Sequence, residues 1–288
     1  SLFPARPEGT QRTGIIAATA PPEPDTSTGN LNRPHLNHKT PAGLTDATPT
    51  SMIEALAKAK GRGKGYASNK VLLLFSGPYN RPDGLAAYLE AGGLTVVQVD
   101  NDQAHGGDSA HDICRDEFFQ SLLKRIAMGE FLAIFAAPPC STFSVSRFFP
   151  KPGERCPPII RSRSHIMGTP DVPPAHRAEL ERSNEIIRRL CILLHVARGS
   201  DTEFCIENPI DRGNPAEPDT FMAREHGPLW LMPDILTLQR VVGCLTVSFA
   251  QCAFGSAAQK YTTFMYSPGL HGLLSPLGRR VCTHGPGG

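Results

Sequence analysis

The sequence has 288 residues, 29 lysines and arginines against 27 aspartates and glutamates, and a formal net charge of +2. This length suits one large α/β domain with an additional unstructured segment, and so mild a charge does not by itself require a nucleic-acid partner. No run of about 18 apolar residues is present, and the amino end lacks the charged-then-apolar layout of a signal peptide, so we expect neither membrane insertion nor secretion. Eight scattered cysteines without a regular spacing indicate a reduced, intracellular protein without a metal site.

Residues 1–65 are expected to form a disordered arm or linker. Most of this segment is rich in proline, threonine and asparagine and poor in large apolar side chains, so it cannot bury enough surface to offset the entropy lost on folding. Residues 66–288 carry the periodic apolar patterns, and we predict that they form the folded domain.

The patterns between residues 70 and 136 predict a βαβ unit followed by a second helix and strand. The continuous apolar run VLLLF is typical of a strand buried on both faces, as in a parallel sheet. Asp83 is placed to cap the first helix and Gly92 to end it. The predicted elements are strand Val71–Phe75, a short helix with Leu85, Ala86, Tyr88 and Leu89 on its apolar face, strand Leu94–Val99, helix Asp116–Met128 and strand Phe131–Ala136.

The second half of the domain continues this alternation after a long irregular stretch. Residues 147–174 are rich in proline, arginine and serine and have no periodicity, which indicates a functional lid or a disordered segment. The later elements are helix Ala175–Arg198, strand Glu203–Ile206, and two strands, Leu245–Ala250 and Tyr261–Tyr266, joined by a glycine-containing turn. We therefore predict an α/β fold with a mostly parallel sheet and helices on both faces.

Unusual residues stand at the carboxyl ends of four predicted strands: Phe75-Ser76-Gly77, Asp100, Cys140 and Glu207-Asn208-Pro209. In a parallel sheet these ends share one edge, so the groups can converge on one cleft. The glycine allows close approach of the backbone to a ligand. A carboxylate after the second strand is where an α/β nucleotide site binds ribose hydroxyls.

Cys140 follows a strand and two prolines, on a stiff loop where ligand chemistry collects. A cysteine there is a nucleophile if its surroundings favour the thiolate, and a half-buried packing residue if they do not. A cysteine hydrolase would also need a histidine base, for which His165 and His195 are the candidates.

Taken together, these motifs resemble the cytosine-5 methyltransferases, and in particular short members encoded by phages and mobile elements. VLLLFSG at 71–77 resembles the family's cofactor loop, LTVVQVD at 94–100 its second strand with the acidic end, PPCSTFS at 138–144 its catalytic loop, and IENP at 206–209 its Glu-Asn motif. The resemblance implies a Rossmann-like class I methyltransferase fold. Residues 66–288 would form the catalytic domain, without an evident target-recognition region.

The resemblance also implies site residues. S-adenosylmethionine would be bound by Phe75, Ser76, Gly77, Asp100, Asp112 and Pro138. The thiolate of Cys140 would add to carbon 6 of cytosine, Glu207 would bond ring nitrogen 3, and Asn208 would fix that carboxyl group. The family's Gln-x-Arg-x-Arg segment is replaced here by QKYT at 259–262, in which Lys260 is expected to supply the positive charge.

The expected substrate is cytosine in DNA, with RNA left open, because such a pocket requires the base to leave its stack. The irregular loop is expected to close over the base, and the predicted nucleic-acid contacts are Ser144, Arg147, Arg161 and Arg163. We expect a monomer that acts inside the cell, with a nuclear location left open. A second interpretation is a degenerate fold that binds nucleic acid or cofactor without turnover, since the arginines of the late motif are absent.

Overall fold

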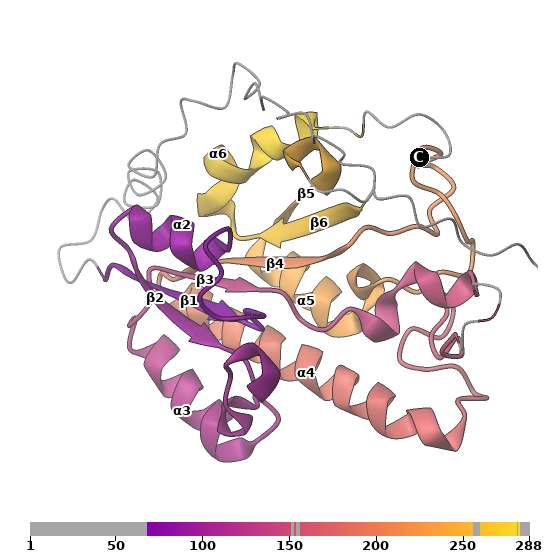
Figure 1. The fold of residues 1–288 in the computed structure, drawn as a ribbon, viewed down its shortest axis with the longest axis horizontal. Coiled ribbons are helices and arrows are strands. Elements are labelled where there is room, and N and C mark those ends of the chain that lie inside the picture. The colour runs from indigo at the N-terminus through magenta and orange to yellow at the C-terminus, as the bar shows by residue number, and fades with distance from the viewer. Residues whose placement is uncertain (1–67, 151–152, 154–155, 256–259, 281, 283–288) are drawn as a thin grey trace, which may run out of the picture. The chain divides into compact units, whose positions relative to one another are not determined.

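A computed structural model describes residues 68–150, 153, 156–255, 260–280 and 282. The predicted arm over residues 1–65 lies outside this range. The described residues form an α/β structure around a sheet of six strands in the order β2-β1-β3-β4-β6-β5 (Figure 1). The strands are β1 Lys70–Leu74, β2 Thr95–Val99, β3 Ala133–Ala136, β4 Glu203–Pro209, β5 Leu245–Ala250 and β6 Tyr261–Tyr266. Neighbours from β2 to β4 pair in parallel, whereas β6 is antiparallel to both β4 and β5.

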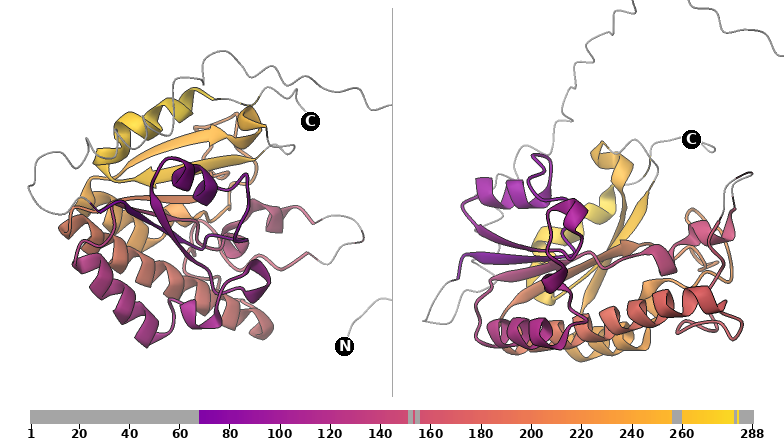
Figure 2. Two further views of the ribbon diagram at one scale, coloured as in Figure 1. Left: turned by 60° about the vertical axis from the view of Figure 1, so that its left-hand side comes forward. Right: turned by 60° about the horizontal axis from the view of Figure 1, so that its bottom comes forward.

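Helices cover both faces of the sheet, as predicted (Figure 2). They are α2 Leu85–Ala91, α3 Asp116–Ala127, α4 Pro174–Gly199, α5 Pro233–Val242 and α6 His271–Leu274. Helices α3, α4 and α5 pack on one face, and α2 and α6 pack on the other. Successive side chains of a strand point to opposite faces, so β1 contributes Leu72 and Leu74 to the first layer and Val71 and Leu73 to the second.

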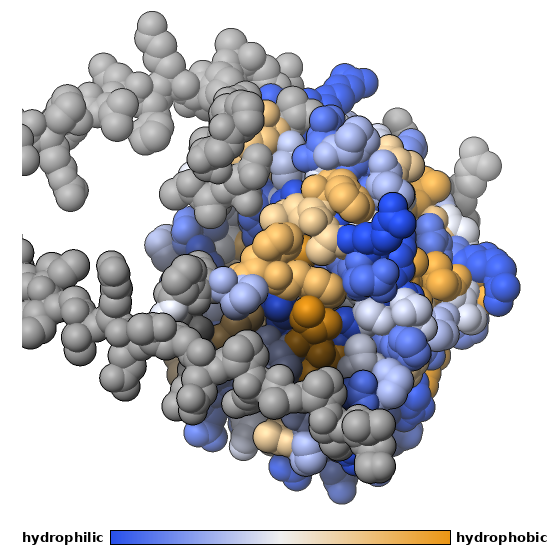
Figure 3. Space-filling model, turned by 90° about the vertical axis from the view of Figure 1, so that its right-hand side faces the viewer, coloured by the Kyte–Doolittle hydropathy of each residue, from blue (hydrophilic) through white to orange (hydrophobic). Residues whose placement is uncertain are grey.

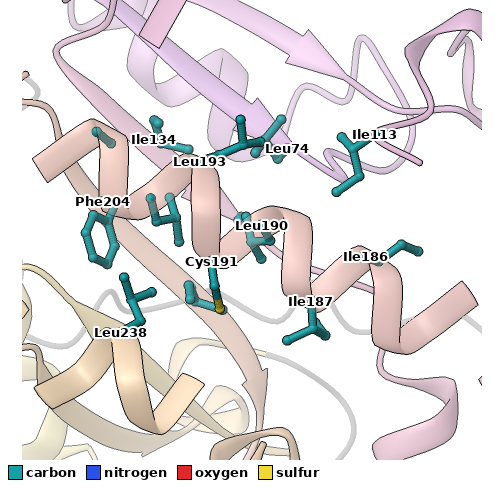
Figure 4. Close-up of a cluster of buried hydrophobic side chains, with 14 of the residues drawn as sticks. Leu74, Ile113, Ile134, Ile186, Ile187, Leu190, Cys191, Leu193, Phe204 and Leu238 are labelled. Atoms are coloured by element: carbon teal, nitrogen blue, oxygen red, sulfur yellow. The ribbon is translucent and has the colours of Figure 1, made fainter. Parts of the chain in front are cut away.

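The larger core lies between α4 and the centre of the sheet (Figure 4). Leu190 and Leu193 of α4 are fully buried together with Ile134 of β3 and Phe204 of β4. Leu238 of α5 belongs to the same cluster. This packing fixes the two central strands. Cys140 lies beyond the carboxyl end of β3, whereas Glu207 lies inside β4, which extends past its predicted end at Ile206 to Pro209.

Two local expectations for α2 are wrong. Gly84, and not Asp83, is the N-cap residue, and it provides no side-chain hydrogen bond to the helix. Asp83 instead pairs with Arg81, with a nitrogen–oxygen distance of 3.0 Å. Of the predicted apolar face, Leu89 is buried, but Tyr88 is 62% exposed. A helix of seven residues is too short to lay a wide apolar stripe on the sheet.

Helix α5 was not predicted, although its sequence carries terminal signals. Pro233 opens it and Gly243, with a φ of 74°, follows its last turn. Proline in the first turn and a left-handed glycine just past the end are ordinary helix boundaries. The helix packs against α4, and its Ile235 and Leu238 join the same apolar cluster on this face of the sheet.

The strand order places a topological switch point between β1 and β3. The chain leaves β1 through α2 to β2 on one side, then returns through α3 to β3 on the other. Ligands of open α/β sheets bind in the crevice outside the strand ends at such a point. The segments that follow β1 and β3, which are Phe75-Ser76-Gly77 and Ala137–Cys140, therefore meet at one crevice.

The segments that follow β3 and β4 gather at one end of the sheet. Several of their large apolar side chains are exposed, including Phe149, Ile159, Phe221 and Met222. Figure 3 views this end of the molecule and shows apolar surface bordered by polar and charged residues. This end of the molecule therefore presents hydrophobic as well as hydrophilic surface.

Candidate active site

The loop after β1 makes a tight turn toward β2. Phe75 has a left-handed φ of 58°, a conformation that is rare for a non-glycine residue, and Gly77 has a φ of 67°. The backbone amide of Gly77 donates to Oδ2 of Asp100, at 2.9 Å. A strained residue held in this way is typical of ligand-binding loops. The acidic end of β2 thus fixes the glycine loop, and both reach the same crevice.

A cavity of about 100 Å³, partly open to solvent, lies at this crevice. Its walls combine apolar side chains with two carboxylates, and this combination suits a nucleoside-like ligand. The lining residues are Leu74, Phe75, Val99, Asp100, Asn101, His111, Asp112, Ile113, Pro139, Arg182 and Ile186. Nδ1 of His111 is buried and has no hydrogen-bond partner among the described residues, so a ligand polar group can satisfy it.

The cavity brings together three of the six predicted cofactor residues: Phe75, Asp100 and Asp112. Ser76 instead lines a second cavity of about 210 Å³ beside α2. Pro138 is buried, and its neighbour Pro139 lines the first cavity in its place.

Asp112 does not stand free in the cavity wall. Its Oδ2 accepts a hydrogen bond from Nη2 of Arg182 at 2.9 Å, and its Oδ1 accepts one from the amide of Cys114 at 2.9 Å. Arg182 extends from α4, so the long helix contributes a positive group to the cavity. No local pattern in the sequence points to this arginine, because its partner is 70 residues away.

Cys140 is half-buried at the start of a short 3-10 turn, Ser141–Phe143. Burial raises the pKa of its thiol, and the negative charge of Glu207 raises it further, whereas the positive charge of Lys260 lowers it. The three groups therefore lie within electrostatic reach of one another, although they come from three separate segments of the sequence. The effect of burial on the pKa of Cys140 is larger than that of Lys260, so the protonated thiol is favoured.

Glu207 lies between two residues at the beginning of β6. The hydroxyl of Thr262 donates a hydrogen bond to Oε1 of Glu207. Nζ of Lys260 is 3.6 Å from the same oxygen. Lys260 and Thr262 are two positions apart along an extended segment, so they share one side of it. Thr262 was not predicted as a site residue. Its position two residues after Lys260 in an extended segment was the signal that could have identified it.

Asn208 connects β4 to the loop that carries Cys140. Its side chain is 1% exposed, and Nδ2 donates to the backbone oxygen of Pro138 at 3.0 Å. Oδ1 of Asn208 is buried without a partner among the described residues. The amide therefore acts on the cysteine loop, two residues before the thiol, and not directly on Glu207.

The predicted nucleic-acid residues have different surroundings from those expected. Arg147 and Arg161 are buried, with 7% and 2% of their surface exposed, so in this arrangement neither presents its guanidinium group to a phosphate. Arg163 forms an ion pair with Asp211, with a nitrogen–oxygen distance of 2.9 Å. The hydroxyl of Ser144 hydrogen-bonds that of Ser146.

The structure offers no base for a cysteine hydrolase among the described residues. His165 and His195 are both exposed, and no histidine in the described ranges is hydrogen-bonded to Cys140. Within the same ranges, no three histidine, cysteine, aspartate or glutamate side chains gather closely enough to hold a metal ion. No helix of the described residues is long and apolar enough to cross a membrane.

Comparison with known proteins adds no assignment to this geometry. No protein-family model matches the chain, and a search of curated proteins finds no match.

Proposed function

We propose that this protein transfers a methyl group from S-adenosylmethionine to carbon 5 of cytosine in DNA. The observation that carries the proposal is the grouping of Cys140, Glu207 and Lys260 at the strand ends beside the switch-point cavity. The sheet order, with its switch between β1 and β3, agrees with a Rossmann-like class I methyltransferase fold. A protein that modifies DNA would act inside the cell, and in a eukaryote in the nucleus.

The cavity residues fit the cofactor. Asp100 and Asp112 offer carboxylates for hydroxyl and amino groups, while Phe75 and the apolar walls accept a planar base. The unpartnered Nδ1 of His111 adds a further polar contact. S-adenosylmethionine supplies an electrophilic methyl group when it is bound.

Cys140 has the role of nucleophile. Carbon 5 of cytosine is a poor nucleophile, and addition of the thiolate to carbon 6 forms an S–C bond and moves an electron pair onto carbon 5. That pair would form the bond to the methyl group, with S-adenosylhomocysteine as the leaving group. Loss of the carbon 5 proton to water would then re-form the double bond between carbons 5 and 6 and expel the Cys140 thiolate, which breaks the S–C bond. Lys260 favours the thiolate form that this attack requires.

Glu207 stabilises the charge that the addition creates. A protonated Glu207 donates a hydrogen bond to ring nitrogen 3, where negative charge develops. Thr262 and Lys260 hold the other side of this carboxyl group. The cytosine must leave its base stack to reach the two side chains.

The experiment is transfer of a labelled methyl group from S-adenosylmethionine to DNA and, separately, to RNA. The matched pair of variants is Cys140→Ser and Cys156→Ser, since Cys156 lies on the following loop, outside the site. We expect label in cytosine of DNA with the parent protein and Cys156→Ser, and none with Cys140→Ser. Transfer that survives in Cys140→Ser, or label in a base other than cytosine, contradicts the proposal.

The second candidate is a fold that binds cofactor or nucleic acid without turnover. One observation favours it, because burial raises the pKa of Cys140 and leaves the unliganded thiol protonated. Calorimetric binding of S-adenosylmethionine by a protein that transfers no label to either nucleic acid would establish this alternative.

A further inference from the structure

Two buried arginines hold the turn that follows Cys140. Arg161 is 2% exposed, and its Nε donates to Oγ1 of Thr142 at 3.1 Å. Its guanidinium carbon lies 4.3 Å from the centre of the Phe143 ring, a cation–π contact. Its Nη1 donates to the backbone oxygen of Ile166 at 2.5 Å. Arg161 therefore joins the cysteine turn to the loop before α4.

Arg147 holds the first residue of the same turn. Its Nε donates to the backbone oxygen of Ser141 at 2.7 Å, and its Nη1 donates to the backbone oxygen of Pro158 at 2.8 Å. Its Nη2 pairs with Oε1 of Glu179 on α4 at 2.5 Å. The same carboxylate oxygen accepts the hydroxyl of Ser141 at 3.3 Å.

Two further contacts complete the support from other elements. The hydroxyls of Thr142 and Ser183 of α4 lie 2.9 Å apart. Nε2 of His226 is 2.9 Å from the backbone oxygen of Phe143, and its Nδ1 accepts the amide of Arg212 at 3.0 Å, so Nε2 is the donor. All three residues of the turn are thus fixed by side chains that are distant in sequence.

This arrangement is unfavourable as a means of stability alone. Burial lowers the pKa of Arg161 to about 10, and its Nη2 has no partner among the described residues. Apolar residues of similar volume stabilise a protein core as well as buried charges or better. Buried charged residues that do not favour stability concentrate at functional sites, where the geometry of the site matters more than stability.

We propose that Arg147 and Arg161 are positioning residues that set the exposure and orientation of the Cys140 thiol. They act through the turn Ser141–Phe143 and touch no reacting atom. The biological meaning of this role rests on the proposed function, in which Cys140 is the nucleophile. The role itself is measurable without methyl transfer, because it predicts how fast the thiol reacts.

The test is alkylation by iodoacetamide of the full chain, with the rate at Cys140 read by peptide mass spectrometry. The variant is Arg161→Met, and the control is Arg177→Met, an exposed arginine of α4 outside the network. Release of the turn uncovers the thiol, so we expect alkylation of Cys140 to accelerate about tenfold in Arg161→Met. Cys252, which follows β5 and has no contact with this network among the described residues, is the internal reference in the same sample, and its rate should stay constant.

A second variant separates positioning from folding. Thr142→Val removes the hydroxyl that Arg161 and Ser183 share, without removing a charge, and should accelerate Cys140 alkylation in the same direction. If Arg161→Met does not fold, as judged by circular dichroism, Thr142→Val decides the question. The inference is overturned if the variants fold and Cys140 is alkylated at the same rate as in the parent protein. It is also overturned if Arg161→Met binds DNA more weakly while the alkylation rate of Cys140 is unchanged. These outcomes can be read even if the protein transfers no methyl group.

Discussion

Replacing Asn208 with aspartate changes one group of a buried side chain and tests how β4 holds the cysteine loop. The Nδ2 group that donates to the Pro138 oxygen at 3.0 Å becomes an oxygen. An ionised carboxylate cannot donate, so two acceptors face each other in a site where the residue is 1% exposed.

The magnitude follows from two contributions. Loss of the hydrogen bond costs about 1 kcal/mol, and burying the unpaired acceptors adds about 2 kcal/mol. The expected loss in the free energy of unfolding at pH 7 is therefore about 3 kcal/mol, equivalent to raising the pKa of the new carboxyl group by about two units. Asn208→Leu is the matched control. It removes the donor and also the unpartnered Oδ1, and should cost only about 1–2 kcal/mol.

The pH dependence separates the two variants. A carboxyl group whose pKa is raised by folding is protonated below its unfolded pKa of about 4, where it can donate to Pro138. The loss in the free energy of unfolding caused by Asn208→Asp should therefore be small at pH 4 and grow toward neutral pH. The loss caused by Asn208→Leu should stay constant. Urea unfolding followed by circular dichroism at both pH values measures this. An aspartate variant as stable as the parent at pH 7 would show that the hydrogen bond from Asn208 to Pro138 does not hold the cysteine loop.

The remaining predictions concern the site charge, a salt bridge and the core. Lys260→Met removes the charge that lowers the pKa of Cys140, so the pH profile of Cys140 alkylation should move to higher pH. The pKa of Glu130 is lowered to about 2, chiefly by its hydrogen bond to Arg125. Glu130→Gln should therefore lower the free energy of unfolding by about 1–2 kcal/mol at pH 7, after allowance for solvent screening. In urea titrations this loss should shrink as the pH falls from about 4.5 toward 2. Leu190→Ala empties a fully buried position in the centre of α4 and should cost about 3 kcal/mol in the same titration, while a loss below 1 kcal/mol would contradict the packing described.

Much of the architecture could be predicted from the sequence because parallel strands leave a strong local pattern. The runs Val71–Leu74 of β1 and Ala133–Ala136 of β3 are continuously apolar, since both faces of the sheet are covered, and β4 carries the shorter apolar run Phe204–Ile206. Each apolar run is followed by polar or small residues such as Gly77 or Cys140. Because the strands were expected to be parallel, these residues could be expected to lie at the same edge of the sheet. The position of β6 between β4 and β5 did not follow, because an antiparallel insertion depends on pairing across 60 residues and not on local composition.

The site was predictable only where its chemistry stands at strand ends. Phe75 and Asp100, which follow β1 and β2, line one cavity, as the order of motifs indicated. Asp112 lines it too, but it follows no strand and was expected only from the family resemblance. The burial of Arg147 and Arg161 was not predictable, because a charged side chain in an irregular, proline-rich segment is normally exposed. Their partners lie on three other segments, and only the folded structure brings these together.

The most direct test of the account is to trap the reaction on an oligonucleotide that contains 5-fluorocytosine, in the presence of S-adenosylmethionine. Fluorine on carbon 5 cannot leave as a proton does, so a methylated adduct keeps its S–C bond. We predict a covalent protein–DNA complex whose digest places the methylated nucleotide on the Cys140 peptide, and no complex with Cys140→Ser. A parent protein that binds both the oligonucleotide and S-adenosylmethionine yet forms no adduct would contradict the account.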